Sequence, residues 1–188
     1  MRLLSLFSVS LCLLLISTPV RAQPPSGGER PFLDLDDDGT TDFELKSTQM
    51  MGNEDVMSFE VMIAPKRKNQ VVAQKQENPR IGDKERFVTA FEKGDSIGKA
   101  LPDTLEWAPK VPLPPKIYDF VSDLSVPWKG PWPSEEAQYL GLKLVKNGKT
   151  YHGWAKLRLD RKYAWAVSIR EKAYNPCPGR PIRAGHRP

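Results

Sequence analysis

The last third of the chain alternates apolar and polar residues with a period of two, the pattern of strands that bury one face. Three such runs cover residues 139–145, 150–159 and 163–169. Asn147-Gly148, between the first two runs, favours a type I′ hairpin turn. The pattern predicts a three-stranded antiparallel meander with one buried side. The residues predicted to be buried are Leu140, Leu142, Leu144, Tyr151, Ala155, Leu157, Leu159, Tyr163, Trp165, Val167 and Ile169.

The opposite side of the meander is predicted to be polar; it carries Lys143, His152, Trp154, Lys156, Arg158 and Arg170. We expect His152 to be a surface or capping histidine, because no second ligand stands at metal-binding spacing from it. Trp154 has two interpretations. It stacks on a sugar or aromatic ligand, or the proline-rich stretch 101–133 covers it.

The rest of the chain is also predicted to be mostly strand. Residues 57–63 alternate in the same way, a turn is predicted at 52–55, and 69–74 form a further short strand. Residues 84–91 predict a helical turn, with a strand as the alternative, because short apolar runs are ambiguous. The fold class is therefore all-β, an antiparallel β-sandwich of jelly-roll-like type with at most one or two short helices.

Residues 101–133 combine many prolines with three tryptophans. Proline cannot donate a backbone hydrogen bond, so the stretch is predicted to form loops and edge strands. Its tryptophans either plug one end of the core or close a ligand groove. The candidate ligand-binding residues are Trp107, Trp128, Trp132 and Trp154.

Residues 34–42 read D-x-D-x-D-G-x-x-D and contain five aspartates in nine positions. Carboxylates at positions 1, 3 and 5 converge from one tight loop, and Gly39 at position 6 permits a positive φ. An EF-hand is excluded, because position 12 is Leu45 and the residues after the loop alternate as a strand does. The pattern predicts a calcium loop between two strands, with ligands from Asp34, Asp36, Asp38, Asp42 and the Thr40 carbonyl.

The alternative to calcium is a bare acidic turn, since turns favour Asp and Gly. Mutual repulsion of the five aspartates favours the bound cation. Calcium would also replace the stabilisation that a disulfide gives outside the cell. Only Cys177 remains after the predicted cleavage, so no intrachain disulfide is expected. Cys177 is predicted to be an idle or buried thiol, with an intermolecular disulfide as the alternative.

The N-terminus predicts export. Arg2 precedes an apolar run over 3–16, and residues 18–22 end in a small-residue cleavage site. The run is shorter than the roughly 20 residues of a membrane span, and an uncleaved anchor is the alternative. The predicted organisation is a signal peptide over 1–22, a flexible leader over 23–30, one β-sandwich domain over 31–185 and a tail over 186–188.

Cleavage would leave 166 residues and lower the formal net charge from +5 to +3, because Arg2 and Arg21 are removed. That length suits one domain with a sizeable core. The small charge excess gives little reason to expect nucleic acid as a partner. With no second apolar span in the sequence, we expect a soluble protein that is secreted or periplasmic.

No catalytic motif is recognisable, whether a phosphate loop, a Ser-His-Asp order or a His/Cys metal cluster. The leading hypothesis is a secreted, non-catalytic, calcium-stabilised β-sandwich module. It would bind a glycan or an envelope protein, or be a structural envelope component. The alternative is a carbohydrate-active hydrolase without a recognisable motif. The oligomeric state is not predicted.

Both ends of this domain resemble an uncharacterised group of secreted bacterial proteins. Residues 34–43 match its D-x-D-x-D-G-x-x-D-F segment, residues 151–157 match Y-x-G-W-x-x-L, and residues 173–185 match A-Y-x-x-x-P-G-x-P-I-x-A-G. The chain departs from the group at Glu171 and Lys172, where Asp and Tyr are frequent. The resemblance implies an exported bacterial protein and carries no activity with it.

Export predicts a defined mature N-terminus. Mass spectrometry of the protein recovered outside the cytoplasm should find Gln23, or its cyclised form, as the first residue. Retention of Met1 on most of the protein in a membrane fraction would instead indicate an uncleaved anchor.

Overall fold

The computed structural model describes residues 32–51, 57–77, 84–109, 116–121, 132, 137–160 and 166–188. All regular structure within these ranges is β-strand, which confirms the all-β prediction and is consistent with a sandwich-like fold. The predicted signal peptide and leader, the 52–55 turn and Trp128 lie outside the described residues.

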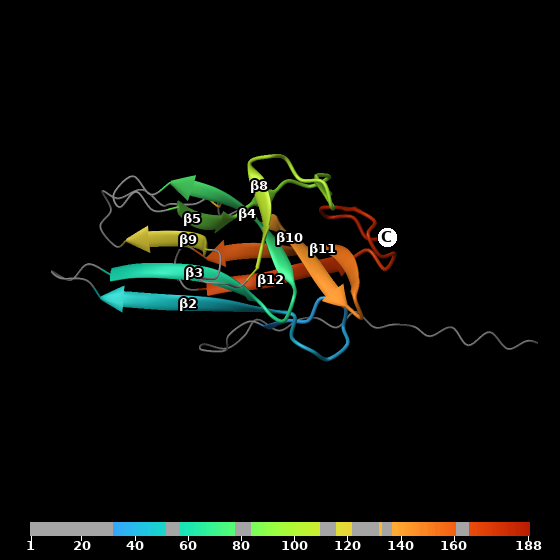
Figure 1. Cartoon of the computed structure of the whole chain (residues 1–188). Coiled ribbons are helices and arrows are strands. Elements are labelled where there is room, and N and C mark those ends of the chain that lie inside the picture. Colours follow the sequence, from blue (N-terminus) through green and yellow to red (C-terminus); the bar gives the residue numbers. More distant parts are fainter. Residues whose placement is uncertain are drawn as a thin grey trace, which may run out of the picture.

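The strands, in chain order, are β1 (Phe32–Leu33), β2 (Phe43–Met51), β3 (Met57–Pro65), β4 (Gln70–Glu77), β5 (Lys84–Val88), β6 (Ala90–Phe91), β7 (Ser96–Ile97), β8 (Leu105–Ala108), β9 (Lys116–Val121), β10 (Gln138–Lys146), β11 (Lys149–Asp160), β12 (Ala166–Tyr174) and β13 (Ile182–Arg183). The main sheet has the order β1-β2-β3-β9-β5-β4-β10-β11-β12, with β6 also paired to β10 and β8 to β4 (Figure 1). β7 and β13 form a separate pair. The recorded pairings are antiparallel, except that β5 and β9 run parallel.

The main core joins residues from both ends of this sheet. Leu33 and Phe43 come from the first strands, and Leu142 and Leu157 come from the C-terminal meander, yet all four belong to one buried cluster. The sheet therefore curls until its first and last strands share one apolar interior, which is how a sandwich removes two apolar faces from water.

The C-terminal meander forms, and its third strand, β12, continues past the predicted end at 169 to Tyr174; Tyr163 and Trp165, which were predicted to be buried, lie outside the described residues. β10 and β11 pair through the Asn147-Gly148 turn, whose φ angles of 52° and 72° are both positive, as a type I′ turn requires. β11 pairs with β12, with a bulge between Lys156 and Leu157. Leu142, Leu157 and Val167 are buried, so the predicted core face is confirmed at these positions.

Residues 84–91 form strands β5 and β6, so the predicted helical turn is wrong and the alternative holds. β5 lies between β4 and β9 in the sheet. Phe87 and Val88, which point to opposite faces of the strand, are both buried. A strand that is covered on both faces carries adjacent apolar residues. In the sequence alone, such a run of apolar residues cannot be told from one turn of an amphipathic helix.

The proline-rich stretch contains more regular structure than predicted. β8 and β9 both lie within 101–133, and β9 is an interior strand between β3 and β5. Neither β8 nor β9 contains a proline. No ladder hydrogen bond is therefore lost to proline within either strand.

The predicted polar side of the meander is wrong at two positions. His152 is 1% exposed and Trp154 is completely buried. The C-terminal segment 175–186, which has no alternating sequence pattern, folds back over β11 and covers both. The Trp154 Nε1–H donates to the His186 carbonyl at 2.8 Å, and Ile182 and Ala184 join Trp154 in a second apolar cluster. The proline-rich stretch also contributes, as one interpretation of Trp154 predicted: Leu101, Leu105 and Trp107 pack against the same cluster.

The burial pattern of β11 predicts which substitutions unfold the protein. Leu157→Ala should lower the free energy of unfolding by about 2–5 kcal/mol, because it leaves a cavity in the shared core. Arg158→Ala, one residue along on the exposed side, should change it by less than about 0.5 kcal/mol. Urea denaturation measures both, and a larger loss for Arg158→Ala would mean that the register is misassigned.

Candidate metal centre

The aspartate loop connects β1 to β2, as the sequence predicts. Its base is closed by the Asp42 N–H, which donates to the Leu33 carbonyl at 2.9 Å. Leu35, at the second loop position, is 2% exposed and packs in the main core. It reaches β11 at Gly153, where an added Cβ would lie 2.9 Å from the Leu35 side chain. The loop is therefore anchored by an apolar residue set between its aspartates.

The turn inside the loop is held by its own carboxylates. The Asp34 carboxylate accepts the N–H groups of Asp38 at 3.2 Å and Gly39 at 2.7 Å. The Asp38 carboxylate accepts the Thr40 N–H at 2.8 Å. Gly39 has a φ of 81°, as expected from its position, and Asp37 has a φ of 59°. These bonds fix the carboxylates while leaving lone pairs free for a cation.

Asp42 and Asn69 tie the loop to two other parts of the sheet. Asp42 is 2% exposed, and its carboxylate accepts the Leu35 N–H at 2.9 Å and the Asn69 side-chain amide at 3.2 Å. The amide oxygen of Asn69 accepts the Val145 N–H of β10 at 2.9 Å. Asn69 therefore joins the loop, the β3–β4 turn and β10. Sequence reasoning missed it, because it follows a run of basic turn residues and has no distinctive spacing.

Three of the predicted ligands come together. Asp34, Asp36 and Asp42 each offer a carboxylate oxygen, and these oxygens lie within 4.8 Å of one another. This acidic triad is an arrangement able to hold a metal ion. The Asp36 side chain is only 5% exposed, and its Oδ1 atom has no hydrogen-bond partner. A buried carboxylate oxygen without a partner is costly, and a cation at the triad would remove that cost.

The other two predicted ligands lie beside the triad. Asp38 is exposed and is not grouped with it; its Oδ2 atom accepts from the Lys146 ammonium at 2.8 Å. Thr40 donates its N–H to Asp38. Of the five predicted ligands, the structure thus groups Asp34, Asp36 and Asp42.

Two lysines from the C-terminal meander also contact the loop, and the sequence did not indicate either contact. The Lys146 ammonium, at the end of β10, lies 2.6 Å from Asp36 Oδ2 as well as near Asp38. The Lys172 ammonium, on β12, donates to Asp37 Oδ1 and to the main-chain carbonyl of Asp34. The partners in these contacts are at least 108 residues apart in the sequence, so a local motif search does not find them.

The charges of the loop influence one another's titration. Hydrogen bonds from Lys146 and the Thr40 N–H lower the pKa of Asp38 to about 2. Burial raises the pKa of Asp42, and the neighbouring charges of Asp36 and Asp34 add to the increase. The bonds to Asp36 and Asp38 raise the pKa of Lys146. The carboxylates of the triad thus repel one another, and the Lys146 ammonium stabilises the charged forms of Asp36 and Asp38.

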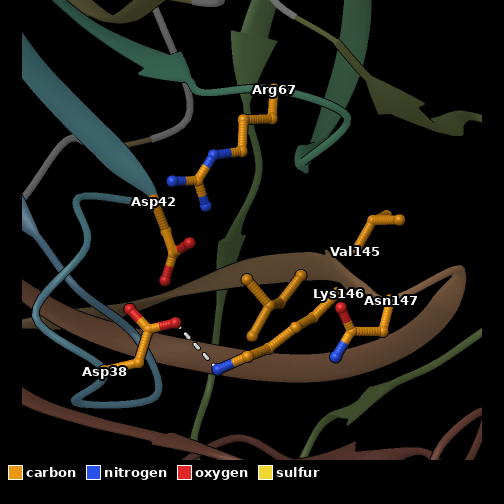
Figure 2. Close-up of a pocket in the computed structure, with 7 residues that line it drawn as sticks. Asp38, Asp42, Arg67, Val145, Lys146 and Asn147 are labelled. Atoms are coloured by element: carbon orange, nitrogen blue, oxygen red, sulfur yellow. Dashed lines mark hydrogen bonds and ion pairs between the residues drawn. The ribbon is translucent and has the colours of Figure 1, made fainter.

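An open pocket of about 300 Å³ adjoins the loop (Figure 2). Asp38 is bonded to Lys146 at its edge, and the Arg67 side chain points toward Asp42. Arg67 lies in the basic turn at 66–68 and has a φ of 54°. The pocket gives solvent and small ions a route to the loop.

The described tryptophans are divided between the two apolar clusters: Trp132 belongs to the main core, and Trp107 packs against the second cluster, which contains Trp154. Trp132 is 3% exposed, and its Nε1–H donates to the Val88 carbonyl at 2.8 Å. Trp154 is enclosed by the second apolar cluster. Trp107 is half-buried, with its ring centroid 5.7 Å from that of His152 and 4.5 Å from the Lys143 ammonium. These three side chains do not form a common exposed patch; Trp128 lies outside the described residues.

His152 and Cys177 occupy different environments. Burial lowers the pKa of His152, and its Nδ1 atom lies 2.9 Å from the Arg180 carbonyl, a contact that holds the C-terminal segment on β11. Cys177 is an exposed free thiol in that same segment. Neither residue is part of the acidic triad.

No protein-family model, curated protein or solved structure matches this chain. Within the described ranges, no helix is long and apolar enough to cross a membrane.

Asn69 provides a test of the loop's attachment. Asn69→Ala should lower the free energy of unfolding by about 1–3 kcal/mol, because it leaves buried polar partners on Asp42 and Val145 unpaired. Lys68→Ala, an exposed change in the same turn, is the matched control. Equal stabilities of the two variants in chemical denaturation would show that the Asn69 bridge contributes nothing.

Proposed function

We propose that this chain is an exported, non-catalytic β-sandwich module that one calcium ion stabilises at the acidic triad. The observation that carries the proposal is the buried Asp36 oxygen that lacks a hydrogen-bond partner beside two other carboxylates. Export enters the proposal only from the sequence of residues 1–22.

The donor set favours calcium over softer metals. The triad offers carboxylate oxygens alone, and hard oxygen donors suit calcium and magnesium, whereas zinc sites in proteins usually include His or Cys. Calcium accepts six to eight oxygens in flexible geometry, so Asp38, the Thr40 carbonyl and water can complete its coordination. Magnesium demands a near-ideal octahedron, which a loop anchored at Leu35 and Asp42 is less able to adjust to.

The hydrogen bonds around the triad support the same interpretation. Asp34 is oriented by main-chain N–H groups, and Asp42 is oriented by Leu35 and Asn69. Outer partners of this kind fix the direction of metal ligands and limit the entropy lost on binding. The site resembles a structural metal site, because its ligands link β1 and β2 to the rest of the sandwich.

A structural role, or binding of an envelope protein, is favoured over a glycan-stacking surface. Sugar stacking requires an exposed aromatic face, whereas Trp132 and Trp154 are buried and pack in the two apolar clusters. The calcium ion would then maintain the fold rather than take part in a reaction.

Calcium should stabilise the wild-type protein against heat. We expect a dissociation constant of roughly 10⁻⁴–10⁻³ M, as in extracellular modules. Calcium at a hundredfold excess over this constant then adds about 2.7 kcal/mol, which raises the melting temperature by about 5–10 °C for a domain of this size. Scanning calorimetry with calcium and with EDTA measures the difference.

Asp36→Asn should abolish this calcium response, because it removes the buried carboxylate and keeps the side-chain volume. Asp103→Ala, at an exposed aspartate far along the chain from the loop, should retain the full response. The proposal fails if the wild-type melting temperature is the same in calcium and in EDTA, or if Asp36→Asn responds as the wild type does.

A further inference from the structure

We propose that Lys146 is an internal competitor for the calcium site, so that calcium binds by displacing the Lys146 ammonium from Asp36 and Asp38. This inference rests on the proposed calcium site and concerns its regulation. It would make the loop a cation-exchange site whose affinity is set by a lysine of the β10–β11 hairpin.

The geometry places one positive charge where another would bind. The Lys146 ammonium lies 2.6 Å from Asp36 Oδ2 and 2.8 Å from Asp38 Oδ2. Asp36 belongs to the triad, and Asp38 is the predicted ligand that lies beside it. The second oxygen of Asp36, Oδ1, remains buried and unpartnered, so Lys146 satisfies only part of this carboxylate.

The two cations exclude each other electrostatically. Calcium would lie about 2.3–2.6 Å from its carboxylate oxygens. A calcium ion on Asp36 and an ammonium on the same carboxylate would therefore be only a few ångströms apart, with little water between them. Repulsion between like charges at this distance is strong where the surroundings are partly buried. Calcium binding therefore requires Lys146 to leave.

The Lys146 side chain can move away from the loop into solvent. It is 40% exposed and borders the open pocket that Figure 2 shows, so the ammonium can move into solvent without disturbing the core. Asp38, released by this movement, is then free to turn toward the metal. The displaced lysine reduces the net affinity of the loop, which fits a site for the high calcium concentrations outside cells.

Lys172 is the natural control. Like Lys146, it joins the loop to the C-terminal meander through ion pairing and a charged hydrogen bond. Its partners are the Asp37 carboxylate and the Asp34 main-chain carbonyl, and neither is a predicted calcium ligand. Its removal therefore lowers the positive charge near the loop without freeing a ligand.

The test is calcium titration of the metal-free full chain, followed by the NMR signals of the loop amides. Lys146→Met should bind calcium on the order of tenfold more tightly than the wild type, whereas Lys172→Met should stay within about threefold of it. If the wild type binds and Lys146→Met binds no more tightly, the competitor role is overturned while the calcium site stands. If neither binds, the calcium site itself fails, and the inference fails with it.

A second measurement uses the wild-type chain and does not depend on a variant folding. Limited acetylation followed by peptide mass spectrometry reports how accessible each lysine amine is. Calcium should increase the acetylation of Lys146 several-fold and leave Lys172 within error, because only Lys146 is displaced. Unchanged Lys146 reactivity at saturating calcium would overturn the proposal.

Discussion

Neutralisation of the aspartate loop is the interaction on which the arrangement of the sandwich depends. The loop carries five aspartates, and the described cations that contact it, Lys146 and Lys172, come from β10 and β12. These partners are in place only when the sheet has curled and its first and last strands share one core. Loop charge and sheet closure are therefore coupled: a sheet that opened would leave the carboxylates repelling one another.

Apolar packing makes the same connection independently of charge. Leu35 is buried between two aspartates and meets β11 at Gly153, where a larger residue would clash with Leu35 and with the Ala173 carbonyl. Asn69 adds a buried amide that joins Asp42 to β10. Hydrophobic, hydrogen-bonded and ionic contacts thus converge on one short loop. A metal ion bound there would stabilise the closed sheet, not only the loop.

The features that sequence predicted correctly are those with a local signature. Alternation identified β3 and the buried face of the meander, Asn147-Gly148 identified its turn, and the aspartate spacing located three carboxylates that meet. The predictions failed where residues far away in the sequence determine whether a side chain is buried. The β5 segment was assigned a helical turn because its second face is covered by tertiary contacts. His152 was assigned to the surface because the segment 175–186, which has no alternating sequence pattern, covers it. The contacts of Lys146 and Asn69 with the loop and with β10 exist only in the folded sheet, so no sequence pattern indicates them.

The fold of the covering segment 175–186 gives a physical reason for the glycines and aliphatic residues of the A-Y-x-x-x-P-G-x-P-I-x-A-G pattern at 173–185. The Gly179 N–H donates to the Thr150 carbonyl at 2.8 Å, and Gly179 and Gly185 have φ angles of 73° and 75°. These positions favour glycine because other residues are strained there. Ile182 and Ala184 lie between these two glycines in the sequence, and both are buried in the same cluster as Trp154. The aspartate loop and the C-terminal segment therefore have similar structural roles. Each combines a turn at glycine with buried aliphatic residues, and each packs against the β10–β12 meander. The loop differs from the C-terminal segment in its charge: main-chain N–H groups, Asn69 and the two lysines pair with its carboxylates, and the buried Asp36 Oδ1 atom is left without a partner.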